Sequence, residues 1–92
     1  MNTLSNESKF QDFAIIVKYV KPTSIKGSRV SISSPYFNKK KLVGFSYEFN
    51  SIGEQFAKML IDAKIELVSY GQLPNQDIFM VNWDDGKKFF NI

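Results

Sequence analysis

The residues between Phe13 and Tyr47 have the side chains best suited to chemistry, and that chemistry is the binding of anions. This stretch contains no Asp or Glu but has seven cationic side chains. They are Lys18, Lys21, Lys26, Arg29, Lys39, Lys40 and Lys41. A net charge of +3 for the whole chain and +7 for this stretch leave −4 for the remainder. Such a charge separation concerns binding partners rather than the fold.

Catalytic chemistry has few residues available. The chain has no Cys and no His, which removes disulfides, thiolate nucleophiles, Cys/His zinc sites and imidazole acid–base catalysis. A Ser–Lys dyad of Ser28 and Lys26 would rest on two common residue types in a predicted turn. The carboxylates from Glu48 onward match no metal-binding loop, and Asp84 and Asp85 are typical turn residues. We therefore expect a non-enzymatic protein with no catalytic residues, no metal and no cofactor.

Length and composition favour one small domain. The chain has 92 residues, of which 43% are hydrophobic and 15% aromatic, as in folded globular proteins. Residues 1–11 are polar and predict a flexible leader, followed by a single domain over residues 12–92. No segment is long and apolar enough to cross a bilayer, and the N-terminus lacks the pattern of a secretory signal. We expect a cytoplasmic protein without membrane contact.

Three strands are expected in the first half of the chain. Residues 13–20 have apolar side chains on both faces and predict a central strand. Residues 29–33 alternate between apolar and polar side chains, as in a half-solvated strand. A third strand is predicted over residues 41–49, where four large side chains would share one face. These are Val43, Phe45, Tyr47 and Phe49.

The turn between the first two strands, residues 21–28, is a second candidate for anion binding. Pro22 cannot donate a hydrogen bond to a sheet and Gly27 permits a positive φ, so a long turn with exposed lysines is predicted. Successive backbone N–H groups near Gly27 could surround a phosphate. The order Lys-Gly-Ser and the missing upstream glycine differ from a P-loop, so a structural turn is the preferred interpretation.

One helix is expected to begin at Asn50 or Ser51. Ser51 and Glu54 fit a capping box, in which each side chain accepts a hydrogen bond from a free backbone N–H group. The following apolar side chains form a stripe that predicts packing across a sheet. They are Ile52, Phe56, Met59, Leu60 and Ala63. Ile61 falls on the polar side, either as an exposed contact or at a helix edge covered by a loop.

The remaining segments complete the predicted sheet. Residues 67–71 and 77–83 predict a hairpin, and the Asp-Asp-Gly sequence at 84–86 predicts a turn leading to a short sixth strand over residues 87–91. The expected fold is α+β, an antiparallel sheet of five to six strands with one helix packed on one face, in the order β-β-β-α-β-β. The uncovered face and the edge strands are compatible with a homodimer.

A short motif resembles a known group of proteins. The segment KYVKPTSIKGSRV, from Lys18 to Val30, is similar to the Y-x-x-P-T-x-x-[KR]-G-[SA]-R-[IV] opening of small, uncharacterised accessory proteins of bacterial plasmids, integrative elements and phages. The resemblance continues at Tyr47, at Asn50 and over residues 71–75, but the long N-terminus, residues 39–41 and the tail after residue 83 depart from it. It implies a mobile genetic element in a bacterial host cell, where small proteins counter host defence or assist DNA handling.

Two functions fit these observations. The first is nucleic-acid binding through a Lys-rich sheet face and loops, in which cations contact phosphates beside rings that stack on bases. The predicted contacts are Lys18, Tyr19, Lys21, Lys26, Arg29, Tyr36, Lys39, Lys40 and Lys41. The second is inhibition of a host nucleic-acid-processing protein complex, of anti-CRISPR or anti-restriction type, by protein–protein contact through the basic segment or the acidic half. An AT-rich genome would also raise the Lys content, but it does not explain the missing acids.

Overall fold

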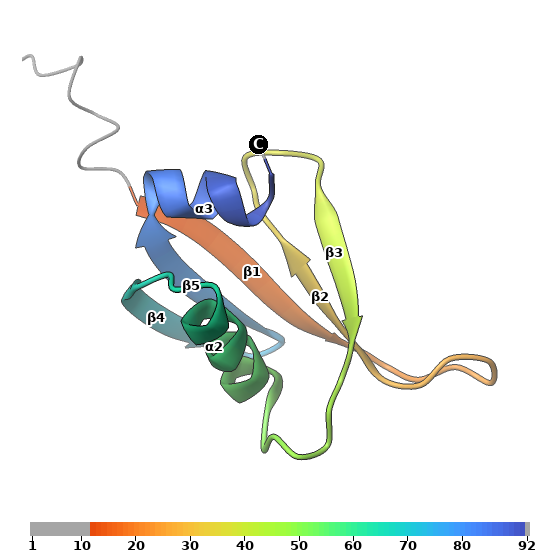
Figure 1. Ribbon diagram of the computed structural model, residues 1–92. Coiled ribbons are helices and arrows are strands. Elements are labelled where there is room, and N and C mark those ends of the chain that lie inside the picture. Colours follow the sequence, from red (N-terminus) through yellow and green to blue (C-terminus); the bar gives the residue numbers. More distant parts are fainter. Residues whose placement is uncertain (1–11, 92) are drawn as a thin grey trace, which may run out of the picture.

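Five strands form one antiparallel sheet in the spatial order β3-β2-β1-β5-β4 (Figure 1). The computed structural model describes residues 12–91, so the predicted leader over residues 1–11 lies outside the described residues. The strands are β1 (Asp12–Val20), β2 (Arg29–Ser33), β3 (Lys40–Gly44), β4 (Leu67–Leu73) and β5 (Gln76–Asn82). The helices are α2 (Ile52–Asp62) and α3 (Trp83–Phe89). The predicted α+β fold with an antiparallel sheet is confirmed.

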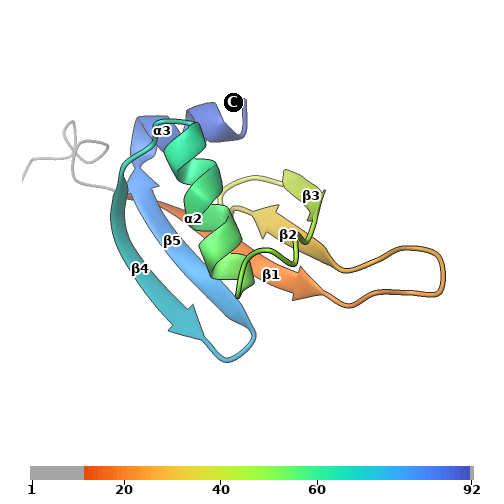
Figure 2. The same ribbon diagram turned by 60° about the horizontal axis from the view of Figure 1, so that its bottom comes forward.

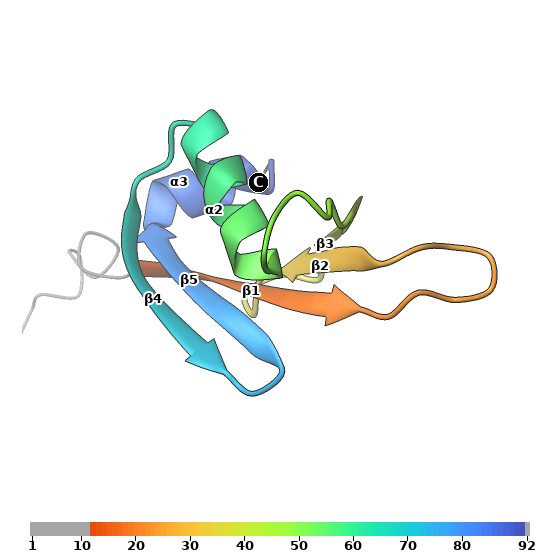
Figure 3. The same ribbon diagram turned by 90° about the horizontal axis from the view of Figure 1, so that it is seen from below.

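Both helices lie on the same side of the sheet, and no described element covers the other side (Figure 3). We call these the helix side and the open face. The core lies between the sheet and the helices, and it is built from alternate residues of the central strands, whose side chains point to one face. Its fully buried members are Phe13, Ile15, Val17, Val30, Ile32, Phe56, Phe79 and Val81.

Helix α2 begins where the sequence predicts. The Ser51 hydroxyl accepts a hydrogen bond from the Glu54 backbone N–H at 3.1 Å, which satisfies one free donor of the first turn. The Glu54 carboxylate accepts from the backbone N–H of Asn50 at 3.0 Å, one residue before the position of an ideal capping box. Ile61 has 69% of its surface exposed, so it is not covered by a loop.

The C-terminal segment forms helix α3 instead of the predicted turn and sixth strand. The Asn82 side chain accepts a hydrogen bond from the Asp84 backbone N–H at 3.0 Å and so caps the helix. Acidic residues in the first turn and lysines in the last turn complement the helix dipole. Gly86 faces the core, where an added Cβ would lie 2.2 Å from the Phe13 ring. The glycine therefore allows α3 to approach β1 closely and does not mark a turn.

Strand β3 is shorter than predicted because Gln55 of α2 binds the chain that follows it. The Gln55 side chain accepts a hydrogen bond from the Ser46 backbone N–H at 2.8 Å and donates one to the Gly44 carbonyl at 3.0 Å. The chain leaves the sheet after Gly44, so the predicted strand over residues 41–49 is wrong in its second half. As a result, 76% of the Tyr47 surface is exposed and this residue does not share a buried face.

Candidate nucleic-acid interface

The nine residues predicted to bind nucleic acid or a partner lie in three places. From the strand registers, Lys18, Arg29 and Lys40 belong to the open face. Residues Lys21 and Lys26 lie in the loop between β1 and β2, and Tyr19 lies at its base. The remaining three lie in β3 and in the connection from β2 to β3, a part of the chain that contacts α3 at the opposite end of the sheet (Figure 1). They are Tyr36, Lys39 and Lys41.

Two residues near α3 are engaged in packing. The Lys41 ammonium group donates a hydrogen bond to the Phe89 carbonyl at 2.9 Å and lies 4.5 Å from the centre of the Phe89 ring. The Tyr36 ring lies 5.1 Å from the Phe13 ring and 5.0 Å from the Trp83 ring, centre to centre. These contacts give Lys41 and Tyr36 a role in holding α3 and β1 together, away from the other predicted residues.

The loop over residues 21–28 extends beyond the sheet (Figures 1 and 2). The Thr23 hydroxyl accepts hydrogen bonds from the backbone N–H groups of Ile25 and Lys26, at 3.3 and 3.0 Å. Since both N–H groups are already bonded, these two are not free to surround a phosphate, which favours the interpretation as a structural turn. Gly27 does not adopt the positive φ that glycine permits, and an added Cβ there would meet no atom within 4 Å. Lys21 and Lys26 are exposed on this loop.

Two exposed tyrosine rings are fixed at the base of the loop. The hydroxyl of Ser28, a buried residue, lies 2.7 Å from the hydroxyls of both Tyr19 and Tyr47. The Phe45 ring packs edge-on against both, with centres 6.2 Å from Tyr19 and 5.0 Å from Tyr47. The sequence indicated Tyr19 as a contact but not Tyr47. The alternation of large side chains continues through Tyr47, so this residue was predicted to share the buried face of a strand.

A groove adjoins Tyr19 because β1 is longer than its neighbour β5. Val17 is paired with Asp77 near the start of β5, so residues 19 and 20 extend past that strand. One part of the groove, about 520 Å³, is lined by Lys18, Tyr19 and residues 73–76. A second part, about 340 Å³, lies beside Tyr19, Lys21 and the start of α2. We call the surface of Lys18, Tyr19, Lys21 and residues 73–76 the loop-end groove.

The loop-end groove combines three kinds of binding group. Lys18 and Lys21 supply positive charge, and Tyr19 supplies an exposed ring. Asn75 and Gln76 supply side-chain amides, which can both donate and accept hydrogen bonds. This set of groups can contact the phosphates, the faces and the edges of nucleotides.

The cations of this surface have no carboxylate partner among residues 12–91. The ion pair within this part of the chain joins Lys58 to Asp62 at 2.6 Å, on the exposed side of α2. The buried Nε atom of Arg29 also has no hydrogen-bond partner there. The unpaired cations of the open face and the loop are Lys18, Lys21, Lys26, Arg29 and Lys40. Their charge is therefore available to an anionic partner.

The centre of the open face is apolar, and the described strands place no aromatic ring on this face. Ile16 is paired with Ile78, and Ala14 with Met80, at the middle of the sheet. Leu42 lies further out on the same face, with 51% of its surface exposed. Because stacking on bases needs an aromatic ring, the open face itself does not provide it, whereas the exposed rings of Tyr19 and Tyr47 beside the cationic loop do.

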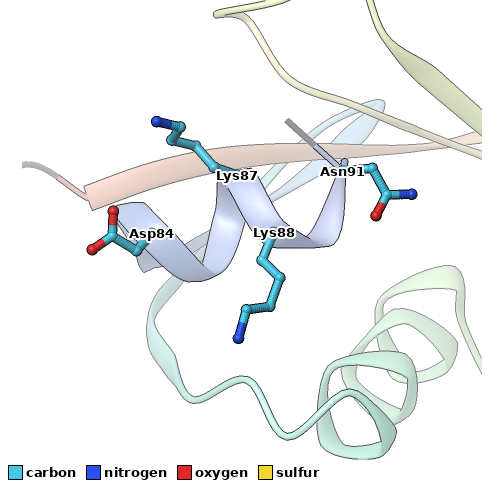
Figure 4. Close-up of a pocket in the computed structure, with 4 residues that line it drawn as sticks. All are labelled: Asp84, Lys87, Lys88 and Asn91. Carbon is cyan, nitrogen blue, oxygen red and sulfur yellow. The ribbon is translucent and has the colours of Figure 1, made fainter.

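A further depression lies on α3 and has no convergent groups (Figure 4). It measures about 540 Å³ and is lined by Asp84, Lys87, Lys88 and Asn91. The Lys87 and Lys88 side chains point to opposite sides of the helix (Figure 4). Within residues 12–91, no three acidic side chains gather as a metal site would require, and neither helix has the length and apolar character to cross a membrane.

Comparisons with protein-family models, with curated proteins and with solved structures find no match to this chain. The resemblance of the segment around Gly27 to accessory proteins of mobile elements therefore stays a prediction.

Proposed function

We propose that the protein is a non-enzymatic accessory protein that binds single-stranded nucleic acid at the loop-end groove. One observation carries the proposal: the exposed rings of Tyr19 and Tyr47 are held at the base of a loop whose cations have no carboxylate partner in the described chain. Cations beside exposed rings are the combination that single-strand binding uses, with phosphate contacts for attraction and stacking for the bases. A phage or mobile element in the bacterial cytoplasm is the setting that the sequence motif implies.

Single strands are favoured over duplexes as the ligand because the exposed tyrosine rings need unpaired bases on which to stack. Bases in a duplex are stacked on one another, so the rings of Tyr19 and Tyr47 can reach unpaired bases more readily. Arg29 is the single arginine of the chain, and bidentate readout of guanine typically uses arginine. We therefore expect most contacts to involve the phosphate backbone, with a weak preference for sequence.

The loop lysines test the electrostatic part of the proposal. Fluorescence anisotropy with a labelled single-stranded oligonucleotide should show binding that weakens with salt, with a logarithmic slope of about −3 for about four phosphate contacts. The double variant Lys21→Glu with Lys26→Glu should weaken binding at least about tenfold and reduce the slope. The matched control, Lys87→Glu with Lys88→Glu on α3, makes the same charge change on the helix side and should have a small effect.

Two results would contradict this part of the proposal. Undetectable binding at about 50 mM salt would show that the cations do not hold a single strand. An equal loss in the loop variant and in the α3 control would show that only the net charge of the protein matters.

Tyr47 tests the stacking part. Tyr47→Ala should weaken binding about tenfold, since stacking on one base contributes about 1–3 kcal/mol. Tyr47→Phe keeps the ring but removes the hydroxyl that lies 2.7 Å from the Ser28 hydroxyl, and it should retain most of the affinity. If Tyr47→Ala binds as well as the unchanged protein, Tyr47 does not stack on a base.

The apolar centre of the open face favours a second candidate function, the inhibition of a host nucleic-acid-processing protein complex. An apolar centre with charged residues around it is the usual composition of a protein interface. Here the surrounding cations Lys18, Arg29 and Lys40 fit an acidic protein surface. Leu42, half exposed at this face, is a suitable anchor.

A variant pair separates the two functions. Protein capture from nuclease-treated host lysate should be lost in Leu42→Asp and kept in Tyr47→Ala if the open face binds a protein. Oligonucleotide binding should show the reverse pattern. Capture that persists in Leu42→Asp would argue against the open face as the protein-binding surface.

A further inference from the structure

Strand β4 is an edge strand without the usual protection against pairing. All seven of its residues are exposed, and four of them are large and apolar. These are Leu67, Val68, Tyr70 and Leu73, with 42–54% of their surfaces exposed. The strand contains no charged residue and no proline, the residues that commonly protect an edge. A bulge between Leu67 and Ser69 is its one irregularity, which leaves residues 69–73 regular.

One side of β4 is paired and the other has no strand beside it in residues 12–91. On the inner side β4 pairs with β5, and the Tyr70 ring packs 4.9 Å from the Phe79 ring. On the outer side the sheet ends, and α2 lies over the centre of the sheet and not beyond β4 (Figure 2). Backbone N–H and C=O groups along this outer side are therefore a template for a further strand.

A groove on the helix side adjoins this edge. It measures about 310 Å³ and lies between α2 and β4. Its lining is largely apolar, with Ala57 of α2 on one wall and Leu67, Tyr70 and Phe79 on the other. A strand added to β4 would place its own helix-side residues next to this groove, because side chains alternate between the two faces.

We propose that β4 pairs antiparallel with β4 of a second copy of this chain, around a two-fold axis perpendicular to the sheet. The absence of charged residues in β4 favours a second copy as the partner, since a neutral strand can pair with itself without placing like charges opposite each other. The contacts are also reciprocal, as a two-fold interface requires. Tyr70 of each copy lies on the helix side, next to the apolar groove of the other.

This pairing joins the two sheets into one continuous sheet. The two-fold axis keeps both sets of helices on one side and both open faces on the other, so the basic residues of the two copies share a surface. The two loop-end grooves then lie at opposite ends of the pairing strands. The inference goes beyond the proposed function and does not depend on it, because the association is measured without nucleic acid.

Sedimentation equilibrium of the full chain, over about a hundredfold range of concentration, tests the proposal. The unchanged protein should approach the mass of a dimer and go no further. The double variant Ser69→Lys with Leu73→Lys should raise the dissociation constant at least about tenfold, because it places lysines of the two copies close together. The matched control, Leu42→Lys with Ile61→Lys, adds the same charge at exposed sites away from β4 and should leave the dimer intact.

Hydrogen exchange of the unchanged protein gives a second measurement that needs no variant. The amides of residues 69–73 that point away from β5 should become more protected as concentration rises, whereas those of β3 should not. A monomer mass at every concentration would overturn the proposal. So would a dimer that the control disrupts and the β4 variant does not, or a mass that keeps growing, since head-to-tail pairing does not close.

Discussion

The two edges of the sheet, β3 and β4, differ in their protection against pairing, since β3 carries lysines and β4 carries no charge. Strand β3 carries Lys40 and Lys41 among its five residues and follows Lys39 directly. Lys40 belongs to the open face, and Lys41 is bound to Phe89 of α3 on the helix side. Strand β4 has seven exposed residues and no charge.

This difference favours β4 over β3 as the edge for the proposed pairing with a second copy. A second copy that paired with β3 would bring lysines close together, which disfavours pairing. The edge of β4 has no such barrier. The lysines of β3 therefore have a structural role, the protection of an edge strand, besides any role in nucleic-acid binding. The lysines of the loop over residues 21–28 lie on no edge strand and form no ion pair with a described carboxylate.

The largest expected effect comes from Gly86 of α3, compared with Gly71 of β4. In Gly86→Ala the new Cβ would lie 2.2 Å from the fully buried Phe13 ring, so either the ring or α3 must move. Overpacking costs about 1–3 kcal/mol or more, offset in part by the better helix propensity of alanine, so we expect a net loss of about 2 kcal/mol in unfolding free energy.

Gly71→Ala is the matched control on the β4 side. Its Cβ would meet no atom within 4 Å, so its unfolding free energy should change by no more than about 0.5 kcal/mol. Urea unfolding measures both variants. Equal stability of the two variants would show that α3 is not packed closely on β1.

A smaller effect separates the two lysines of β3. Lys41→Met removes the hydrogen bond to the Phe89 carbonyl and the cation–π contact with its ring, and should lower the unfolding free energy by about 1 kcal/mol. Lys40→Met, at an exposed position of the same strand, should change it by less than about 0.5 kcal/mol. If both variants lose the same stability in urea unfolding, Lys41 does not anchor α3.

The smallest effect concerns pH and Tyr70 of β4. Partial burial raises the pKa of the Tyr70 phenol above its usual value, and the negative charge of Asp77 and a hydrogen bond to it raise the pKa further. The folded state thus disfavours the phenolate, so stability present below the usual tyrosine pKa of about 10 is lost as pH rises toward the pKa in the folded state.

Tyr70→Phe removes this group and should reduce the loss of thermal stability between about pH 9 and about pH 11. Tyr47→Phe removes one hydroxyl outside β4 and serves as the control. An alkaline loss that is the same in Tyr70→Phe and in the unchanged protein would show that ionisation of Tyr70 does not affect folding.

Local sequence signals were sufficient for most of the sheet and for α2. Apolar side chains on both faces of residues 13–20 predicted β1 as a central strand, and the alternation along residues 29–33 predicted β2 because burial on one face leaves a two-residue period. Ser51 and Glu54 marked the start of α2 because the first backbone N–H groups of a helix need acceptors. The segment after β5 was predicted wrongly as a turn and a sixth strand. Glycine is a common turn residue, but in the fold Gly86 permits close packing of α3 on Phe13.

The candidate site was only partly predictable. The sequence identified Lys21, Lys26 and Tyr19, because missing acids and aromatic residues are visible in the chain itself. It did not identify Tyr47, because Gln55 ends β3 through two hydrogen bonds that join residues about ten positions apart, and no local pattern reports such contacts. It also grouped Tyr36 and Lys41 with the loop, although they pack beside α3 at the other end of the sheet.

The sequence by itself determined the composition of the chain: an acid-free basic stretch between Phe13 and Tyr47, no Cys or His, and an alternation along residues 29–33 that requires a strand with one covered face. The tertiary structure decided which of those charges lie together and which strand is left at each edge. The physical reason is that charge and periodicity are properties of neighbouring residues, whereas strand order and side-chain hydrogen bonds depend on contacts between distant ones. Hence β4, an ordinary neutral strand in the sequence, became an unprotected edge only when the sheet placed it outermost.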